Sequence, residues 1–529
     1  MSKNSYIKGA SIIAVGGIIA KLLGLFFKIP IGRILDSYGY GLYYNSYNIY
    51  NLLLTISVIG VPVAISKMVA ERASVKNYLG VYNVFKISMV ALFILGAISS
   101  VIMYFGARWI INMAGWHIDT YYSIIGLSLA PLFVAIMCSI RGFFQGMQIM
   151  TPSAISQIIE SIIRVVFGIG LCYYLTNSYN QAIGAGGASA GATIAAIFTS
   201  MFLLFVFMIY LKDFNIKIKQ SKKTYKNESI VFLLKRLAQI AVPVTLASAV
   251  VSLFGLVNSF MYVPRLDVAG FDKQIATVLF GDYGLAQTMV NVPLTFSSAM
   301  AITLVPAISE SFVLKDIRSI KYKSELGIRI IILISMPCAI GLSILSQPIF
   351  EMLFPSAQYG GEILKYLSFT TILIMITNTL QSILQGLDKF MIPVKNLLIG
   401  LVFKYIFNYI LIAMPSVNIY GLVLSNLGAY LISSILNYRS LKKYIGIKIN
   451  YNQTIIKPLT ASLIMAIVGI NTYNVLLLFL GNSFAVIITI VVCVFAYIIV
   501  LIVIKGLTKE ELEIMPVKGK MKSFIEKFL

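Results

Sequence analysis

The stretch IKGASIIAVGGIIAKLLGLFFKIPI, residues 7–31, decides the fold of this chain. It is long and apolar enough to form a membrane-spanning helix, because about 20 residues at ~1.5 Å each cross a hydrocarbon core of ~30 Å. Its length, its lysines and the further apolar stretches after it argue against a cleaved signal peptide. We therefore expect these residues to form a retained membrane span.

Three basic residues accompany this stretch: Lys21, Lys28 and, just past Pro30, Arg33. A cation near the bilayer centre costs roughly 2.5–3.5 kcal/mol on insertion scales, so it usually faces a bundle interior or a water-filled cavity. No acidic residue within 7–31 could neutralise these charges. We interpret the three residues as lining a cavity that accepts an anion. The alternative is that long side chains near the span ends reach the interface, which suits Lys21 least because it lies near the middle.

The composition of the whole chain indicates its class. Of its 529 residues, 59% are hydrophobic and 12% are charged, whereas about a quarter of a soluble domain is charged. We therefore expect an integral membrane protein. The net charge of +23 fits basic cytoplasmic loops and anionic lipid surfaces, so it does not require a nucleic-acid partner.

The apolar stretches predict an all-α polytopic membrane protein with about fourteen transmembrane helices, the first two at 7–31 and 40–64. We expect two parallel six-helix lobes around a central cavity, followed by a C-terminal helix pair. The predicted segments are an N-terminal lobe at 1–211, a basic cytoplasmic linker at 212–236, a C-terminal lobe at 237–438, a cytoplasmic linker at 439–458, the extra helix pair at 459–505 and a cytoplasmic tail at 506–529.

The loop charges predict the orientation in the plasma membrane. Most loop cations fall on one side of the predicted spans, among them Lys67, Arg72, Arg141 and the lysines of 212–226. The positive-inside rule makes this side cytoplasmic. Both termini are then expected in the cytoplasm, which agrees with an even number of spans.

Two short repeats relate the predicted lobes. YGL at 40–42 recurs at 283–285, and AIS at 64–66 recurs at 307–309, both at an offset of 243 residues. The same order and offset favour an internal duplication, although some self-similarity also arises by chance in polytopic proteins. Six spans per repeat make the two halves parallel, and transporters built in this way hold the substrate between halves that rock against each other.

A charged pair lies in the predicted fifth span. Glu160 and Arg164 are four residues apart and therefore share one face of a helix. They could form a structural pair that neutralises itself. Alternatively, they line the cavity and exchange partners, so that Arg164 meets the anion of the substrate.

The second half of the chain adds two candidate cations. Lys404 lies in mid-span with Asn408 one turn later, and we expect it to face the cavity. Arg265 follows Pro264 at the outer end of a span, where it is either a rim cation of the cavity or a plain surface residue.

The residues for catalysis or metal binding are scarce. The four cysteines lie in apolar stretches without CxxC spacing, and the one histidine is His117. Neither a nucleophilic triad nor a pair of converging carboxylates can be assembled from these residues. We therefore expect no enzyme, no catalytic residue, no metal and no cofactor.

Two stretches resemble a known family. AKLLG at 20–24, PIGR at 30–33 and YGYG at 38–41 resemble the first helix and the following loop of polysaccharide flippases of the multidrug/oligosaccharidyl-lipid/polysaccharide (MOP) exporter superfamily. GVPVAISKMVAE at 60–71 is most similar to the branch of stage V sporulation protein B, which is related to lipid II flippases. The resemblance implies transport of undecaprenyl-pyrophosphate-linked sugars in cell-wall synthesis. It also places Lys21 at the position of a basic residue that lines the cavity.

These observations predict a flippase that moves a lipid-linked oligosaccharide, or a peptidoglycan precursor such as lipid II, from the inner to the outer leaflet by alternating access. The pyrophosphate would pair with Lys21, Arg164 and either Lys28 or Lys404. The expected partners are the undecaprenyl-pyrophosphate-linked sugar, membrane lipids and cell-wall synthesis proteins. Three alternatives stay open: a cation-coupled multidrug exporter of the same superfamily, a membrane-embedded glycosyl-transfer enzyme, and an assembly partner without transport activity.

Overall fold

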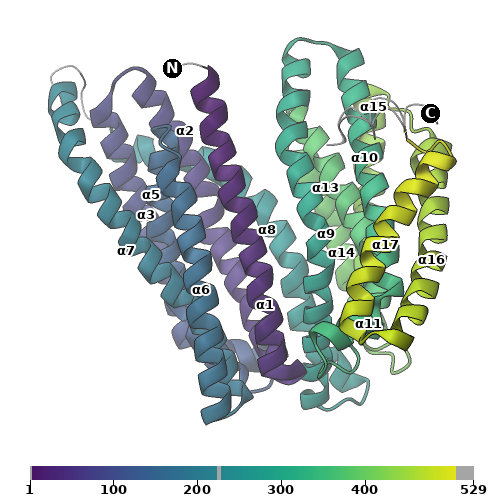
Figure 1. The fold of residues 1–529 in the computed structure, drawn as a ribbon. Helices are drawn as coiled ribbons and strands as arrows, with labels where there is room; N and C mark the ends of the chain where they lie inside the picture. The colour runs from purple at the N-terminus through teal and green to yellow at the C-terminus, as the bar shows by residue number, and fades with distance from the viewer. Residues whose placement is uncertain (1–2, 223–224, 226–227, 508–529) are drawn as a thin grey trace. The chain divides into compact units, whose positions relative to one another are not determined.

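The computed structural model of the protein describes residues 3–222, 225 and 228–507. Helices make up its secondary structure, and no strand occurs within these residues (Figure 1). The predicted class, an all-α polytopic membrane protein, is confirmed. Helices suit this environment because they satisfy every backbone hydrogen bond internally. The predicted tail lies, from residue 508 onward, outside the described residues.

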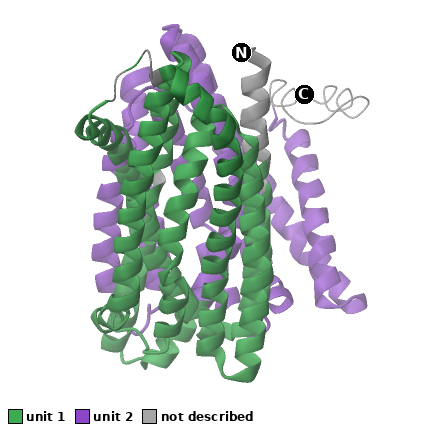
Figure 2. Ribbon diagram, turned by 90° about the vertical axis from the view of Figure 1, so that its left-hand side faces the viewer, with its two compact units in different colours: residues 1–281 green, residues 282–529 purple. Residues whose placement is uncertain are grey.

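The chain divides into two compact units, residues 1–281 and 282–529 (Figure 2). Unit 1 contains α1 (Lys3–Leu54), η1 (Thr55–Ile59), α2 (Gly60–Ser74), α3 (Tyr78–Ala114), α4 (Thr120–Ser128), α5 (Ala130–Gly146), α6 (Thr151–Ser178), α7 (Gln181–Lys222) and α8 (Ile230–Val268). Helix α9 (Lys273–Val313) begins in unit 1 and ends in unit 2. Unit 2 continues with α10 (Ile317–Ile344), α11 (Ser346–Leu353), α12 (Gly360–Leu367), α13 (Thr370–Gly386), α14 (Met391–Leu411), α15 (Tyr420–Ile445), η2 (Asn452–Ile456), α16 (Lys457–Phe479) and α17 (Asn482–Val503).

The number of spans differs from the expected fourteen. Within the described residues, eleven helices are long and apolar enough to cross a membrane, or up to twelve if the pair α12 and α13, bent by 43°, forms one span. One of them runs through α1, η1 and α2 as a single stretch, Ile19–Ser74, and α15 is not among them. The count of fourteen is therefore not confirmed.

Helix α1 contains a sharp break where two separate spans were expected. Asp36 has a φ of 52°, which is unusual for a residue other than glycine, and helical geometry resumes beyond it. Gln181 Nε2 donates a hydrogen bond of 2.7 Å to Asp36 Oδ2, which ties the break to the start of α7. The sequence 7–54 thus forms two helical segments with a change of direction and no intervening loop.

Unit 1 holds α5, α6 and α7 together by aromatic packing and close backbone contact. Phe85, Phe143 and Phe207 from α3, α5 and α7 pack in edge-to-face and tilted pairs with ring centroids 4.4–5.2 Å apart. Helices α6 and α7 touch at Gly168 and Gly191, where a Cβ on Gly191 would lie 2.3 Å from the Cα of Gly168. Such contacts between small residues let membrane helices approach closely. They fix the helices that carry the site described below.

Unit 2 ends in a pair of helices, α16 and α17, which together cover most of the segment 459–505 expected to form one, although α16 begins two residues earlier. The pair packs on α10 through an apolar cluster that includes Leu333, Ile340 and Met465. The hydroxyl of Tyr497 on α17 also donates a hydrogen bond of 2.8 Å to the carbonyl of Leu333 on α10. The two expected linkers are largely helical, since α7 runs to Lys222 and α15 to Ile445.

Candidate anion-binding site

A charged triad lies among α5 and α6 of unit 1. Glu160 Oε1 accepts from Arg164 one turn later at 2.8 Å, and its Oε2 accepts from Arg141 on α5 at 3.1 Å. The side chains of Arg141, Glu160 and Arg164 are 11%, 18% and 24% exposed. One carboxylate thus bridges two guanidinium groups in a largely desolvated position, where such interactions are much stronger than in water.

Arg141 was not expected at this site, because the sequence placed it in a cytoplasmic loop. The apolar stretch ends just before it, but α5 continues to Gly146 and keeps the side chain within the bundle. Arg141 Nε also donates to Ser156 Oγ at 2.8 Å, and the Ser153 hydroxyl donates to the Arg141 carbonyl at 3.4 Å. The sequence signal that could have indicated Arg141 is Glu160 in the neighbouring span. A buried carboxylate needs more than one positive partner to offset its burial.

Arg164 has hydrogen-bonding capacity left over. Its Nε is buried and finds no acceptor among the described residues. Tyr43, Tyr47 and Tyr50 from α1 lie within electrostatic reach of its guanidinium. The tyrosine rings pack on one another, with the centroids of Tyr43 and Tyr47 5.5 Å apart and those of Tyr47 and Tyr50 5.7 Å apart. Arg164 therefore offers an unused donor next to an aromatic wall.

Lys28 joins this group from the first segment of α1. Its Nζ lies 6.0 Å from the centroid of the Tyr47 ring, and its charge acts on that of Arg164. With Lys28, Arg141 and Arg164 opposite a single carboxylate, Glu160, the group carries two uncompensated positive charges. An excess of buried positive charge favours an anionic ligand.

The structure brings together three of the predicted site residues, namely Lys28, Glu160 and Arg164. Lys21 and Arg33 lie on the same helix, α1, but are exposed. Arg265 is half-buried in the last turn of α8. The roles assigned to these residues stay predictions.

Lys404 lies in unit 2 and is 1% exposed. Its Nζ donates to Asn426 Oδ1 at 2.6 Å, and Asn426 Nδ2 donates to the Tyr283 hydroxyl at 2.7 Å. Lys404 therefore begins a buried polar chain that links α14, α15 and α9. Whether it faces a substrate cavity stays a prediction.

Across the part of the chain that the structure describes, no three His, Cys, Asp or Glu side chains gather as a metal site would require. The four cysteines are all free thiols. The contacts seen at the triad are charge pairing and hydrogen bonding.

Comparison with known families identifies the class of protein. Residues 6–312 match the model described as polysaccharide biosynthesis protein, and residues 281–410 match the model described as MatE. These matches and the fold define a membrane transporter of the MOP superfamily. Since the first match covers more than half of the sequence, the chain belongs to the polysaccharide biosynthesis protein family.

Individual relatives agree with this assignment. The chain is 27% identical over 478 residues to lipid II flippase MurJ of Bacillus subtilis (strain 168), covering 88% of this chain and 87% of that protein. It is 25% identical over 524 residues to stage V sporulation protein B of the same organism, covering 98% and 99% of the two chains. The resemblance inferred from residues 20–41 and 60–71 is thus confirmed.

Solved structures show the same fold. A lipid II flippase MurJ in an inward closed conformation matches with a TM-score of 0.66 and 16% identity, over 92% of this chain and 97% of that one. A multidrug resistance MATE family transporter in an inward-facing conformation matches with a TM-score of 0.64 and 17% identity, over 80% and 96%. At these identities the likeness establishes the fold alone.

Proposed function

We propose that this protein flips an undecaprenyl-pyrophosphate-linked oligosaccharide, or a peptidoglycan precursor of the lipid II type, from the inner to the outer leaflet of the plasma membrane. It works by alternating access, with both termini in the cytoplasm, and carries out transport without making or breaking covalent bonds. The observation that supports this proposal most is the excess of positive charge around Glu160. The names of the two Bacillus relatives, a lipid II flippase and a sporulation protein, agree with it.

Arg164 is the residue best suited to receive the pyrophosphate. A guanidinium binds phosphate through two parallel hydrogen bonds, and Arg164 has its buried Nε available for one of them. Lys28 would add a second positive charge to the same headgroup. Lys21, Arg33, Arg265 and Lys404 are further candidate contacts at other stages of the cycle.

Glu160 would act as a placeholder for the substrate anion. In the structure it bridges Arg141 and Arg164, so neither guanidinium is left unpaired. When the phosphate takes Arg164, Glu160 keeps its pairing with Arg141, which Ser156 holds in place. Arg141 and Arg164 would then each keep an ion-pair partner throughout, and this matters because removing the partner of a buried charge is strongly destabilising.

A cation-coupled multidrug exporter is the second candidate function. The MatE match to residues 281–410 and the shared fold favour it. An organic cation, however, needs a site with excess negative charge, and the site around Glu160 has the opposite sign. Anion transport is therefore the better-supported proposal.

The test is rescue of a flippase-depleted bacterial strain by Arg164→Ala at normal protein level. We expect at least a tenfold loss of rescue, because the substrate anion loses its main partner. Arg318→Ala is the matched control, since Arg318 is exposed on α10 and should be dispensable. Full rescue by Arg164→Ala would overturn the proposed site.

A further inference from the structure

The aromatic wall beside Arg164 carries three tyrosine hydroxyls. Tyr43, Tyr47 and Tyr50 follow one another at intervals of four and three residues in the second segment of α1, so they share one face of the helix. None of the three hydroxyls has a hydrogen-bond partner among the described residues. Tyr43 and Tyr50 are nevertheless only 3% and 2% exposed, and Tyr47 is half-buried. Since a buried hydroxyl without a partner is costly, this face is suited to a polar ligand.

The unpaired groups continue along α6. All three tyrosines lie within electrostatic reach of Arg164, and Tyr50 is also within reach of Glu160, one turn earlier on α6. Almost a further turn back, the side-chain oxygen of Gln157 is buried without a partner in the described part of the chain. Gln157 and Arg164 are seven residues apart, so they lie on the same side of α6 and ~10.5 Å apart along its axis. The unpaired polar groups therefore extend beyond the space that one phosphate fills.

Phe27 ties both segments of α1 to α6. Its ring packs edge-on against the ring of Tyr43, with centroids 6.4 Å apart. A Cβ on Gly168 of α6 would lie 2.6 Å from the same phenylalanine ring. The row of hydroxyls is therefore held next to α6 by packing, before any ligand binds.

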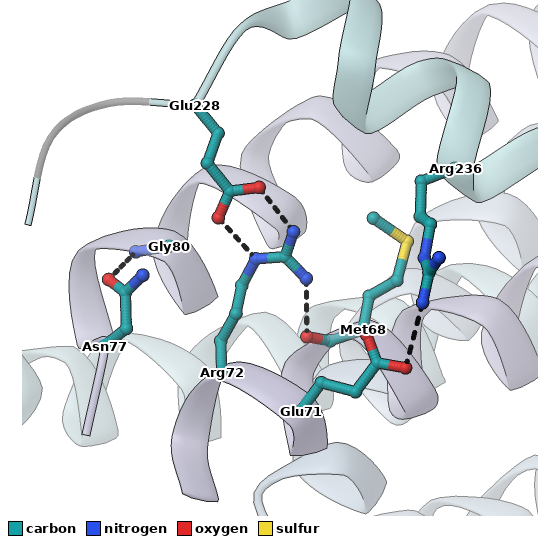
Figure 3. Close-up of polar contacts among 7 residues, drawn as sticks. All are labelled: Met68, Glu71, Arg72, Asn77, Gly80, Glu228 and Arg236. Carbon is teal, nitrogen blue, oxygen red and sulfur yellow. Dashed lines mark hydrogen bonds and ion pairs between the residues drawn. The ribbon is translucent and has the colours of Figure 1, made fainter. Parts of the chain in front are cut away.

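Another arginine of unit 1 shows how a fully paired side chain differs. Arg72 Nε donates to Glu228 Oε1 at 2.7 Å, and a second guanidinium nitrogen pairs with Oε2 of the same carboxylate (Figure 3). The third nitrogen of Arg72 donates to the carbonyl of Met68 at 3.0 Å. Arg164, in contrast, keeps its buried Nε without an acceptor among the described residues. The unpaired Nε, the hydroxyls and the amide oxygen thus lie together in one part of unit 1.

The two ends of this group differ in charge. At one end, Arg164 is joined by Lys28, whose Nζ lies 6.0 Å from the centroid of the Tyr47 ring, and this end suits a phosphate. At the other end the unpaired groups belong to Tyr50 and Gln157, which are neutral and offer an anion no counter-charge. A prenyl chain would leave them unpaired. A sugar ring fits them, because its hydroxyls both donate and accept while its apolar face can pack on a tyrosine ring.

We propose that Tyr43, Tyr47, Tyr50 and Gln157 form a sugar subsite, which binds the sugar unit next to the pyrophosphate while Arg164 holds the pyrophosphate itself. The inference rests on the proposed function and adds the residues that select a glycosylated lipid. Sugar hydroxyls bond to the tyrosine hydroxyls, and the Gln157 oxygen accepts a further O–H or the N–H of an acetamido group. A lipid pyrophosphate without its sugar leaves these buried groups unpaired, so the site disfavours it.

The test compares two probes that differ only in the sugar. One is farnesyl pyrophosphate, and the other is the same lipid pyrophosphate with one N-acetylglucosamine on its terminal phosphate. Dissociation constants are measured by equilibrium binding to the purified full-length protein in detergent. We expect Tyr47→Phe and Tyr50→Phe each to weaken binding of the sugar-bearing probe by about fivefold or more, the effect of one lost hydrogen bond. Binding of the bare probe should stay within about twofold of the parent, which also shows that the variants have folded.

Two further variants sharpen the comparison. Gln157→Met removes the acceptor at the far end and should weaken only the sugar-bearing probe. Tyr173→Phe is the matched control, because Tyr173 lies on the same helix, α6, but is 61% exposed, and both dissociation constants should be unchanged. If Tyr47→Phe and Tyr50→Phe weaken both probes equally, or change neither, the sugar subsite is overturned.

Arg164→Ala separates this inference from the proposed function. It should weaken both probes to a similar extent, since both carry the pyrophosphate. If Arg164→Ala binds both probes as the parent does while the tyrosine variants still discriminate between them, the anion site fails and the sugar subsite stands. If Arg164→Ala weakens both probes but the tyrosine variants do not discriminate, the sugar subsite fails and the anion site stands.

Discussion

The Glu160 side chain is the acidic member of the charged triad that it forms with Arg141 and Arg164. It pairs with two guanidinium groups, so its loss leaves Arg141 and Arg164 without a counter-charge. We expect Glu160→Gln to lower the free energy of unfolding by about 1–3 kcal/mol, as for other partly buried ionic partners. Thermal unfolding of the purified protein in detergent would measure this. Glu310→Gln is the control, since Glu310 is exposed on α9, and equal shifts in the two variants would contradict the placeholder role.

Lys404 gives the opposite prediction for stability. Burying an ammonium group is costly even with a good acceptor such as Asn426, and an apolar side chain of similar length often replaces it without loss. We expect Lys404→Met to leave the thermal unfolding midpoint unchanged or higher while transport falls. A variant with unchanged stability and full transport would make Lys404 a packing residue only.

At the scale of single elements, the close contact between α6 and α7 holds the site in position. A Cβ on Gly191 would lie 2.3 Å from Gly168 and 3.4 Å from the carbonyl of Arg164. We expect Gly191→Ala to force α7 away from α6, with a loss of ~1–3 kcal/mol in stability and a lower transport rate. Gly170→Ala on α6 is the control, because its Cβ would enter open space and it should be neutral or stabilise by ~0.5–1 kcal/mol. Similar losses in both variants would rule out the steric explanation.

Helix ends and helix breaks are the features that could not be predicted from the sequence. Hydropathy and the i, i+4 spacing were enough to predict the class, most helices and the pairing of Glu160 with Arg164. They could not place Arg141. Hydropathy ends a predicted span at the first charged residue, whereas α5 continues past Arg141 because its side chain turns inward to the buried Glu160. Nor could they predict the break at Asp36, where the side chain accepts a hydrogen bond from Gln181, 145 residues away.

At the scale of the whole molecule, we propose that the membrane potential drives transport. In the proposed cycle the pyrophosphate would carry negative charge outward, and an interior-negative membrane favours this by roughly 2.3 kcal/mol per charge per 100 mV. The potential would act mainly on the headgroup provided that the cations of the site do not move across the membrane with it. We expect flipping in proteoliposomes to accelerate as the interior potential is made more negative with a potassium gradient and valinomycin. Proteoliposomes with Arg164→Ala are the control for leakage, and a rate that follows a sodium gradient but ignores the potential would refute voltage as the driving force.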